Sequence, residues 1–266
     1  MLRRNFLSAC TAFAIGCADE PPGVLLVQGA VDGELQPLLT ALEGARSRQI
    51  SAWTFWEGRI GAKRVVVSRT EVGPINAVAA TVLGIERYQP GLVINQGTAG
   101  AHNPDLRLWD IVVGERTVDY GAYTSEHGDA GSGINPARWK PDPHRLRLDG
   151  RQGTSFYTFS GDARAIEAAA AMKNPRGRVV RGTIGSAPQY NRELDMIASI
   201  RARYGTDSED MESAFAHGAA TGLRTRFLAI RMISDSEYSH PHLERVAGQY
   251  CSEFVLELVR SLPQRF

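Results

Sequence analysis

Cysteine is scarce in this sequence of 266 residues. Only three are present, Cys10, Cys17 and Cys251, and two of them lie within the first 22 residues. The remainder of the chain therefore has a single cysteine, which excludes an intramolecular disulfide and a multi-cysteine metal site there. An excess of charge of either sign is also missing. The net charge of +1 excludes the overall basic character of a nucleic-acid-binding protein.

Long apolar runs and nucleotide-binding fingerprints are absent as well. After residue 25 no apolar run approaches the roughly 20 residues that a membrane-spanning helix needs. Neither a phosphate-binding GxxxxGK[ST] loop nor a dinucleotide-binding GxGxxG turn occurs. The histidines are scattered, and the pair His240 and His242 lacks a third ligand at metal-site spacing. We therefore expect no metal and no cofactor.

The first 22 residues have the layout of an export signal. Arg3 and Arg4 form a charged start, an apolar stretch covers 6–16, and a polar segment follows over 19–22. The letters RRNFL resemble a twin-arginine signal, and AIGC resembles a degenerate lipobox that would place a lipid on Cys17. This predicts export, to the periplasm in a bacterium. A cytoplasmic protein with a short N-terminal helix is the alternative.

From residue 23 to 266, short apolar runs alternate with amphipathic helical stretches. The pattern predicts an α/β domain in which crossover helices cover a largely parallel sheet. The segment 125–160 has little periodicity and predicts a lid-like insertion. Strands are expected at 24–31, 64–68, 91–95, 111–114, 178–184 and 226–233, and helices at 32–45, 75–88, 163–172, 194–204, 212–221 and 243–262.

Polar residues gather where four of these elements end or begin, at Glu34, 95–100, 210–213 and 234–235. Active sites in such sheets lie at the carboxyl ends of the strands. Each set alone is also typical of structure, because acidic residues and Ser-Asp pairs often cap helices. The order of the four sets favours function.

Together the sets resemble the nucleoside phosphorylase and nucleosidase superfamily, and most closely the 5′-methylthioadenosine/S-adenosylhomocysteine nucleosidases. The matching motifs are VGPINA at 72–77, NQGTAG at 95–100, WDIVV at 109–113, DMESA at 210–214 and RMISD at 231–235. The resemblance covers nearly all of 23–262. It implies one domain, a three-layer sandwich with a mixed, barrel-like central sheet, and a homodimer.

The resemblance also implies hydrolysis of the N-glycosidic bond of a purine nucleoside, with adenosine, methylthioadenosine or S-adenosylhomocysteine as the type. Asp235 would protonate the purine N7 as general acid, and Glu34 would activate the attacking water as general base. The implied substrate-binding residues are Glu212 at the ribose hydroxyls, Met211 against the sugar, Ser234 orienting Asp235, Thr98 near the water, Ala99 and Gly100 in the small-residue turn, Tyr190 stacked on the base, and Arg231 as a supporting partner.

Two alternatives stay open at this point. Phosphorylases of the superfamily often place an arginine before the Gly-Ser turn to hold phosphate, whereas this chain has Asn95 and Gln96 there. Glu34 would repel phosphate, which favours hydrolysis. The second alternative is a non-catalytic nucleoside- or base-binding protein. The segment 186–191 departs from the family's Ser-Gly-Asp-x-Phe pattern, which leaves the base and the 5′ substituent undetermined.

Overall fold

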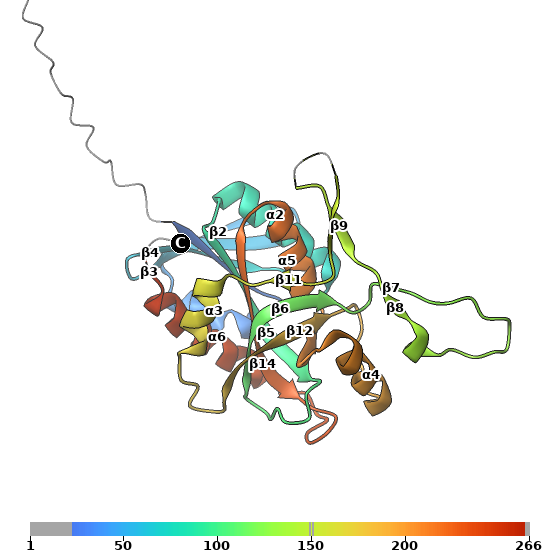
Figure 1. The fold of residues 1–266 in the computed structure, drawn as a ribbon. Helices are drawn as coiled ribbons and strands as arrows, with labels where there is room; N and C mark the ends of the chain where they lie inside the picture. Colours follow the sequence, from blue (N-terminus) through green and yellow to red (C-terminus); the bar gives the residue numbers. More distant parts are fainter. Residues whose placement is uncertain (1–22, 149, 151, 264–266) are drawn as a thin grey trace, which may run out of the picture.

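The computed structural model describes residues 23–148, 150 and 152–263, so the predicted export signal lies outside the described residues. A central sheet is covered by helices on both faces (Figure 1). The strands are β1 Val24–Gly29, β2 Glu43–Ile50, β3 Trp53–Ile60, β4 Lys63–Arg69, β5 Leu92–Ala101, β6 Ile111–Asp119, β7 Tyr123–Thr124, β8 Lys140–Pro141, β9 His144–Leu146, β10 Thr154–Phe156, β11 Phe159–Ser160, β12 Val179–Ser186, β13 Ser208–Asp210 and β14 Arg226–Asp235. The helices are η1 Asp32–Glu34, α1 Gln36–Ala41, α2 Pro74–Tyr88, η2 Pro136–Arg138, α3 Ala163–Ala170, α4 Leu194–Tyr204, α5 Ser213–Gly222 and α6 Val246–Ser261.

Five strands close into a ring. β5 pairs with β14, β14 with β6, β6 with β12, β12 with β13, and β13 returns to β5. The ring mixes parallel and antiparallel pairs, and β1, β4, β3 and β2 extend it from β5 as an open sheet. The prediction of a mixed, barrel-like sheet in a three-layer α/β sandwich is therefore confirmed.

Two apolar cores lie on opposite faces of the sheet. Helices α1, α3 and α6 pack on one face, and α2 and α5 pack on the other. β1 is buried along its whole length, as its continuous apolar sequence predicts for an inner strand with parallel neighbours. No helix in the described part of the chain is long and apolar enough to cross a membrane.

Several predicted boundaries are wrong. The helix expected at 32–45 is reduced to η1 and α1, and residues 43–50 form β2 instead. β2 and β3 escaped prediction. β2 is the edge strand of the sheet, nearly all of it is exposed, and its sequence is polar. β3 lies between β2 and β4 and pairs with both. The expected Gly-rich turn at 97–100 is also wrong, since these residues continue β5.

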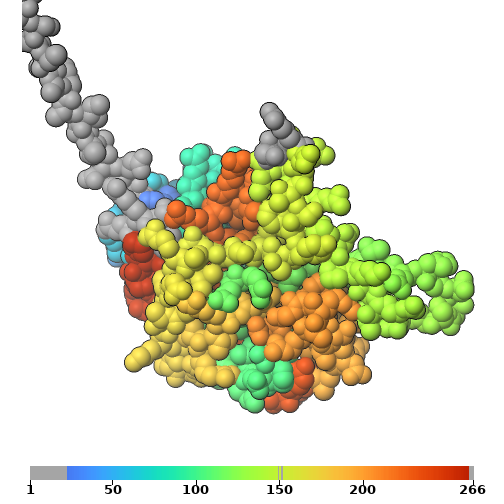
Figure 2. Space-filling model, viewed as in Figure 1, coloured from blue at the N-terminus to red at the C-terminus, as the bar shows by residue number. Residues whose placement is uncertain are grey.

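The segment 125–160 contains short paired strands rather than one unstructured loop. β7 pairs with β8, and β9 pairs with β10. Figures 1 and 2 show the part between β7 and β8 extending away from the body. Tyr123 and Trp139 stack at its base, with ring centroids 4.1 Å apart.

Candidate active site

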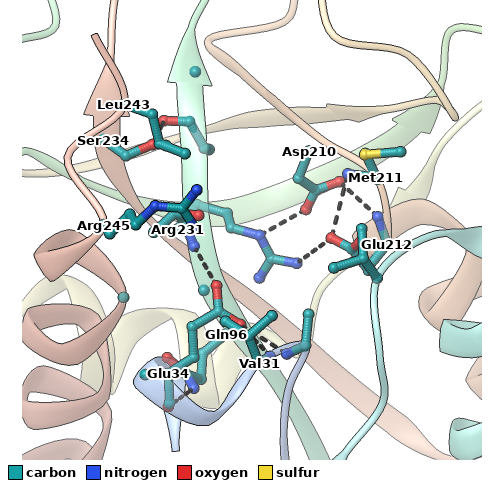
Figure 3. A pocket seen from close by; sticks show the side chains of 18 of the residues that line it. Val31, Glu34, Gln96, Asp210, Met211, Glu212, Arg231, Ser234, Leu243 and Arg245 are labelled. Carbon is teal, nitrogen blue, oxygen red and sulfur yellow. Dashed lines mark hydrogen bonds and ion pairs between the residues drawn. The ribbon is translucent and has the colours of Figure 1, made fainter.

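A cavity of about 630 Å³ opens where β1, β5 and β14 end and where the loops before α2, α4 and α5 and the start of α6 converge (Figure 3). The ring closure and the parallel pairing of β1, β5 and β14 bring these ends to one edge of the sheet. All ten predicted site residues line this cavity: Glu34, Thr98, Ala99, Gly100, Tyr190, Met211, Glu212, Arg231, Ser234 and Asp235.

Glu34 is buried and is held by backbone amides. Its Oε2 accepts a hydrogen bond from Ala30 N at 2.7 Å, and its Oε1 accepts one from Thr98 N at 3.1 Å. Two glycines leave room for it, because a Cβ on Gly97 would lie 2.6 Å from Glu34 Oε1 and one on Gly248 would lie 2.7 Å from its Cγ. Burial raises the pKa of Glu34 above its ordinary value, although Arg231 and the amides oppose the shift. A fixed carboxylate with a raised pKa is suited to accept a proton.

Arg231 is the buried cation of the cavity, with 2% of its surface exposed. Its Nε lies 2.7 Å from Asp210 Oδ2, and its Nη2 donates to Asn95 Oδ1 at 2.6 Å. Glu212 Oε2 is 3.9 Å from the same Nη2. Figure 3 shows this guanidinium directed at the two carboxylates. Its charge is thus compensated by protein groups, and it orders the acidic wall of the cavity.

Glu212 stands on that wall at the start of α5. Its Oε1 accepts a hydrogen bond from Gly73 N at 2.8 Å, which ties it to the turn before α2. Gly73 has a φ of 95°, a conformation that favours glycine. Burial and the neighbouring charge of Asp210 raise the pKa of Glu212. Met211 precedes it and also lines the cavity.

Asp235 is buried at the end of β14, and each of its carboxyl oxygens has a hydroxyl partner. Ser234 Oγ donates to Oδ1 at 2.6 Å, and the Tyr190 hydroxyl donates to Oδ2 at 2.8 Å. The register between β14 and β5 shifts here, because Ile233 pairs with Ala99 while Asp235 pairs with Gly100. Ser234 is therefore an extra residue in a β-bulge. The bulge places Ser234 beside the carboxyl that it contacts.

Sequence reasoning missed residues that support the site. Asp210 and Asn95 lie within the quoted motifs, but their contacts with Arg231 were not predicted. Gln96 was also missed, although its Nε2 donates to Glu34 O at 2.5 Å. Glu209 was missed entirely, and no motif pointed to it. For Tyr190 the sequence suggested a stacking ring, and its hydroxyl contact with Asp235 is an addition.

Two predictions from the sequence, a lid at 125–160 and the absence of a metal site, concern the surroundings of this cavity. None of the described residues in 125–160 lines it, so the lid-like role of that segment stays a prediction. In the described part of the chain, no group of three or more His, Cys, Asp or Glu side chains is placed to bind a metal ion. Two further arginines line the cavity, Arg69 and Arg245. Arg69 pairs with Asp32 and Glu71.

The family model described as Phosphorylase superfamily matches residues 24–259. The 5′-methylthioadenosine/S-adenosylhomocysteine nucleosidase of Geobacillus kaustophilus is 26% identical over 253 residues, which cover 89% of this chain and 97% of that protein. The structure of the same nucleosidase from Neisseria meningitidis, in complex with methylthio-immucillin-A, is similar with a TM-score of 0.74 and 25% identity, over 90% of this chain and 100% of that chain. The Colwellia psychrerythraea nucleosidase in complex with adenine has a TM-score of 0.74 and 24% identity, over 92% and 98% of the two chains. Since the family model spans nearly all of the described chain, the protein belongs to the phosphorylase superfamily.

Proposed function

We propose that this protein is a hydrolase that cleaves the N-glycosidic bond of a purine nucleoside and releases the free base. The observation that carries the proposal is one cavity in which buried Glu34 and buried Asp235 are fixed by different surroundings. Backbone amides hold Glu34, whereas two hydroxyl groups hold Asp235. Two carboxyls in unlike environments can take opposite roles as acid and base. The similarity to nucleosidases supports a substrate of the methylthioadenosine or S-adenosylhomocysteine type.

The residues divide the reaction between them. Asp235 donates a proton to N7 of the purine, which weakens the bond between the base and C1′. Glu34 takes a proton from water, and the water oxygen bonds to C1′ as the bond to the base breaks. Glu212 accepts hydrogen bonds from the ribose hydroxyls. The base leaves with the proton from Asp235. Glu34 then gives the proton it took from water to solvent, and Asp235 takes up a proton from solvent, which restores both carboxyls for the next turnover.

The charges of the cavity disfavour inorganic phosphate as the nucleophile. Glu34, Asp210 and Glu212 line it, and their negative charge repels an anion. Of the two further arginines in the lining, Arg69 is paired with Asp32 and Glu71, and Arg245 has no ion pair within the described residues. Arg231 is already paired with Asp210, and Asn95 accepts two of its hydrogen bonds. Hydrolysis therefore fits this cavity better than phosphorolysis.

The test is to incubate the protein with adenosine, methylthioadenosine, S-adenosylhomocysteine, inosine or guanosine, with and without phosphate. Chromatography measures the free base that is released. Release in phosphate-free buffer is expected and ranks the substrates. Release only with phosphate would make the protein a phosphorylase and remove the base role of Glu34. No release, with nucleoside binding still measured by calorimetry, would favour a non-catalytic binding protein.

We further propose that two copies associate as a homodimer. Apolar side chains are exposed beside the cavity mouth, including Val31, Val72, Ile75 and Leu243. A second copy would cover such a patch. Light scattering at micromolar concentration is expected to give the mass of a dimer, and a monomer alone would contradict the proposal.

Export is also part of the proposal, and it rests on Arg3, Arg4 and the residues that follow them. An exported nucleosidase would act on nucleosides outside the cytoplasm. Cell fractionation is expected to find the protein in the periplasm, with lipid on Cys17 if the AIGC segment is processed as a lipobox. Recovery from the cytosol alone would refute export.

A further inference from the structure

A buried polar cluster adjoins the cavity and has no role in the reaction described so far. Its centre is Glu209 in β13, with 4% of its surface exposed. The Glu209 carboxylate accepts hydrogen bonds from Tyr120 OH at 2.7 Å, from Asn191 Nδ2 at 2.6 Å and from Asn191 N at 3.0 Å. His102 Nε2 lies 3.1 Å from Glu209 Oε2. The carboxylate is thus surrounded by polar groups from three other segments of the chain.

Asn191 is the part of this cluster that reaches the loop between β12 and α4. Besides its two bonds to Glu209, its Nδ2 donates to Tyr120 OH at 2.9 Å. Residues 187–193 of this loop belong to no helix or strand. Asn191 is nevertheless buried, with 8% exposure, whereas the neighbouring Tyr190 is 53% exposed. Asn191 thus ties this irregular loop to β13 and to Tyr120 at the position next to Tyr190. Further contacts of the loop include those from Ala187 N to Asp210 O at 3.2 Å and from Arg192 Nε to Glu237 Oε1 at 2.9 Å.

The fixed loop determines where the Tyr190 hydroxyl lies. Tyr190 is half-exposed, so packing alone leaves its ring free to choose other rotamers. Its hydroxyl nevertheless lies 2.8 Å from Asp235 Oδ2, and Tyr190 is the residue next to the buried Asn191. With Ser234 on Oδ1, both oxygens of Asp235 are then held in one orientation. A carboxyl oriented in advance transfers its proton without first being reorganised.

We propose that Glu209 and Asn191 are positioning residues that act through Tyr190, whose hydroxyl holds the carboxyl of Asp235 in place for proton transfer. The inference rests on the proposed function, in which Asp235 is the general acid. It assigns a task to the segment 186–191, the part of the chain that departs most from the family pattern.

A double-mutant cycle tests the proposal. Tyr190→Phe keeps the ring and removes the hydroxyl, and it is expected to lower kcat about tenfold with KM changed less than about twofold. Asn191→Ala is expected to lower kcat about fivefold or more. Because Asn191 acts through Tyr190, the double variant is expected to lose no more than Tyr190→Phe alone, whereas independent effects would multiply to about 50-fold. Glu209→Gln, combined with Tyr190→Phe, repeats the test by changing the acceptor of the two hydrogen bonds from Asn191.

Tyr157→Phe is the matched control, since Tyr157 is exposed in the 125–160 segment and does not line the cavity. Unchanged kcat in folded Tyr190→Phe, or multiplying losses in the double variant, would overturn the proposal. Where Asn191→Ala does not fold, Asn191→Ser takes its place in the cycle.

A second measurement separates this inference from the proposed function. If the wild-type protein cleaves no nucleoside, the proposed function fails, and hydrogen exchange of the full chain still decides the anchor. Faster amide exchange over 187–193 in Asn191→Ala than in wild type would support an anchored loop. Equal exchange rates would overturn it.

Discussion

Replacement of Glu34 by glutamine tests the centre of the mechanism. In Glu34→Gln the new NH₂ group must face either Ala30 N–H or Thr98 N–H, because each oxygen of the carboxylate now accepts from one of them. A buried donor left without an acceptor costs about 1–3 kcal/mol, while removal of a buried charge offsets part of that cost. We expect the free energy of unfolding to fall by about 1 kcal/mol and the fold to persist.

The effect on catalysis is expected to be much larger. A positioned general base contributes about 10²–10⁴ in rate, so kcat of Glu34→Gln is expected to fall by at least about 100-fold. Base release in phosphate-free buffer gives the rate, and calorimetry is expected to show that nucleoside still binds. Glu86→Gln on the exposed side of α2 is the control and is expected to match wild type. A folded Glu34→Gln protein with kcat within about threefold of wild type would show that another group activates the water.

Three further predictions concern the charges of the cavity. Asp235→Asn is expected to abolish base release while nucleoside binding persists, and an unchanged rate would remove Asp235 from the mechanism. Arg231→Met is expected to lower the free energy of unfolding by about 3–5 kcal/mol, because Asp210 would be left buried without its cation; a loss below about 1 kcal/mol in chemical denaturation would refute this. Because burial raises the pKa of Glu34, kcat/KM is expected to fall as the pH is lowered through a value above the 4.5 of an ordinary glutamate. Between the ordinary pKa of 4.5 in the unfolded chain and the higher pKa of Glu34 in the folded protein, the folded state binds more protons than the unfolded state. The contribution of Glu34 to the free energy of unfolding therefore decreases as the pH rises through this range. A pH profile that in Glu34→Gln keeps the acid limb of wild type would contradict the assignment.

The elements that the sequence predicted best are those whose burial is uniform. β1 and the inner part of β5 are continuous apolar runs, and such runs become inner strands of a covered sheet. The first three residues of β2, 43–45, fell in the helix predicted at 32–45 because the preceding leucines have helical spacing, and no element was predicted for the rest of this polar strand. Its strand conformation depends on pairing with β3, which local patterns do not reveal.

The site divides in a similar way. Residues within contiguous motifs could be picked out from the resemblance, and those that line the cavity include 210–212, Arg231 and 234–235. The contact of Arg231 with Asn95 joins positions 136 residues apart and depends on the register of β14 against β5. The anchor between Glu209 and Asn191 depends on where an irregular loop lies over the sheet. Neither arrangement has a local signature in the sequence.

The extra residue near the end of β14, Ser234, means that the positions of Arg231 and Asp235 in the cavity depend on the number of residues between them. Side chains of a regular strand alternate between its two faces, so deleting one residue between Arg231 and Asp235 would leave the two side chains on opposite faces of the strand. The deletion would separate the guanidinium from the carboxyl without changing either residue. Insertions beyond Asp235, in the loop that leads to α6, leave this spacing unchanged. Engineers who exchange segments between members of this superfamily must therefore transfer Arg231 to Asp235 as one block, and must keep Leu243 and Arg245 of the following loop where the cavity lining is to be preserved.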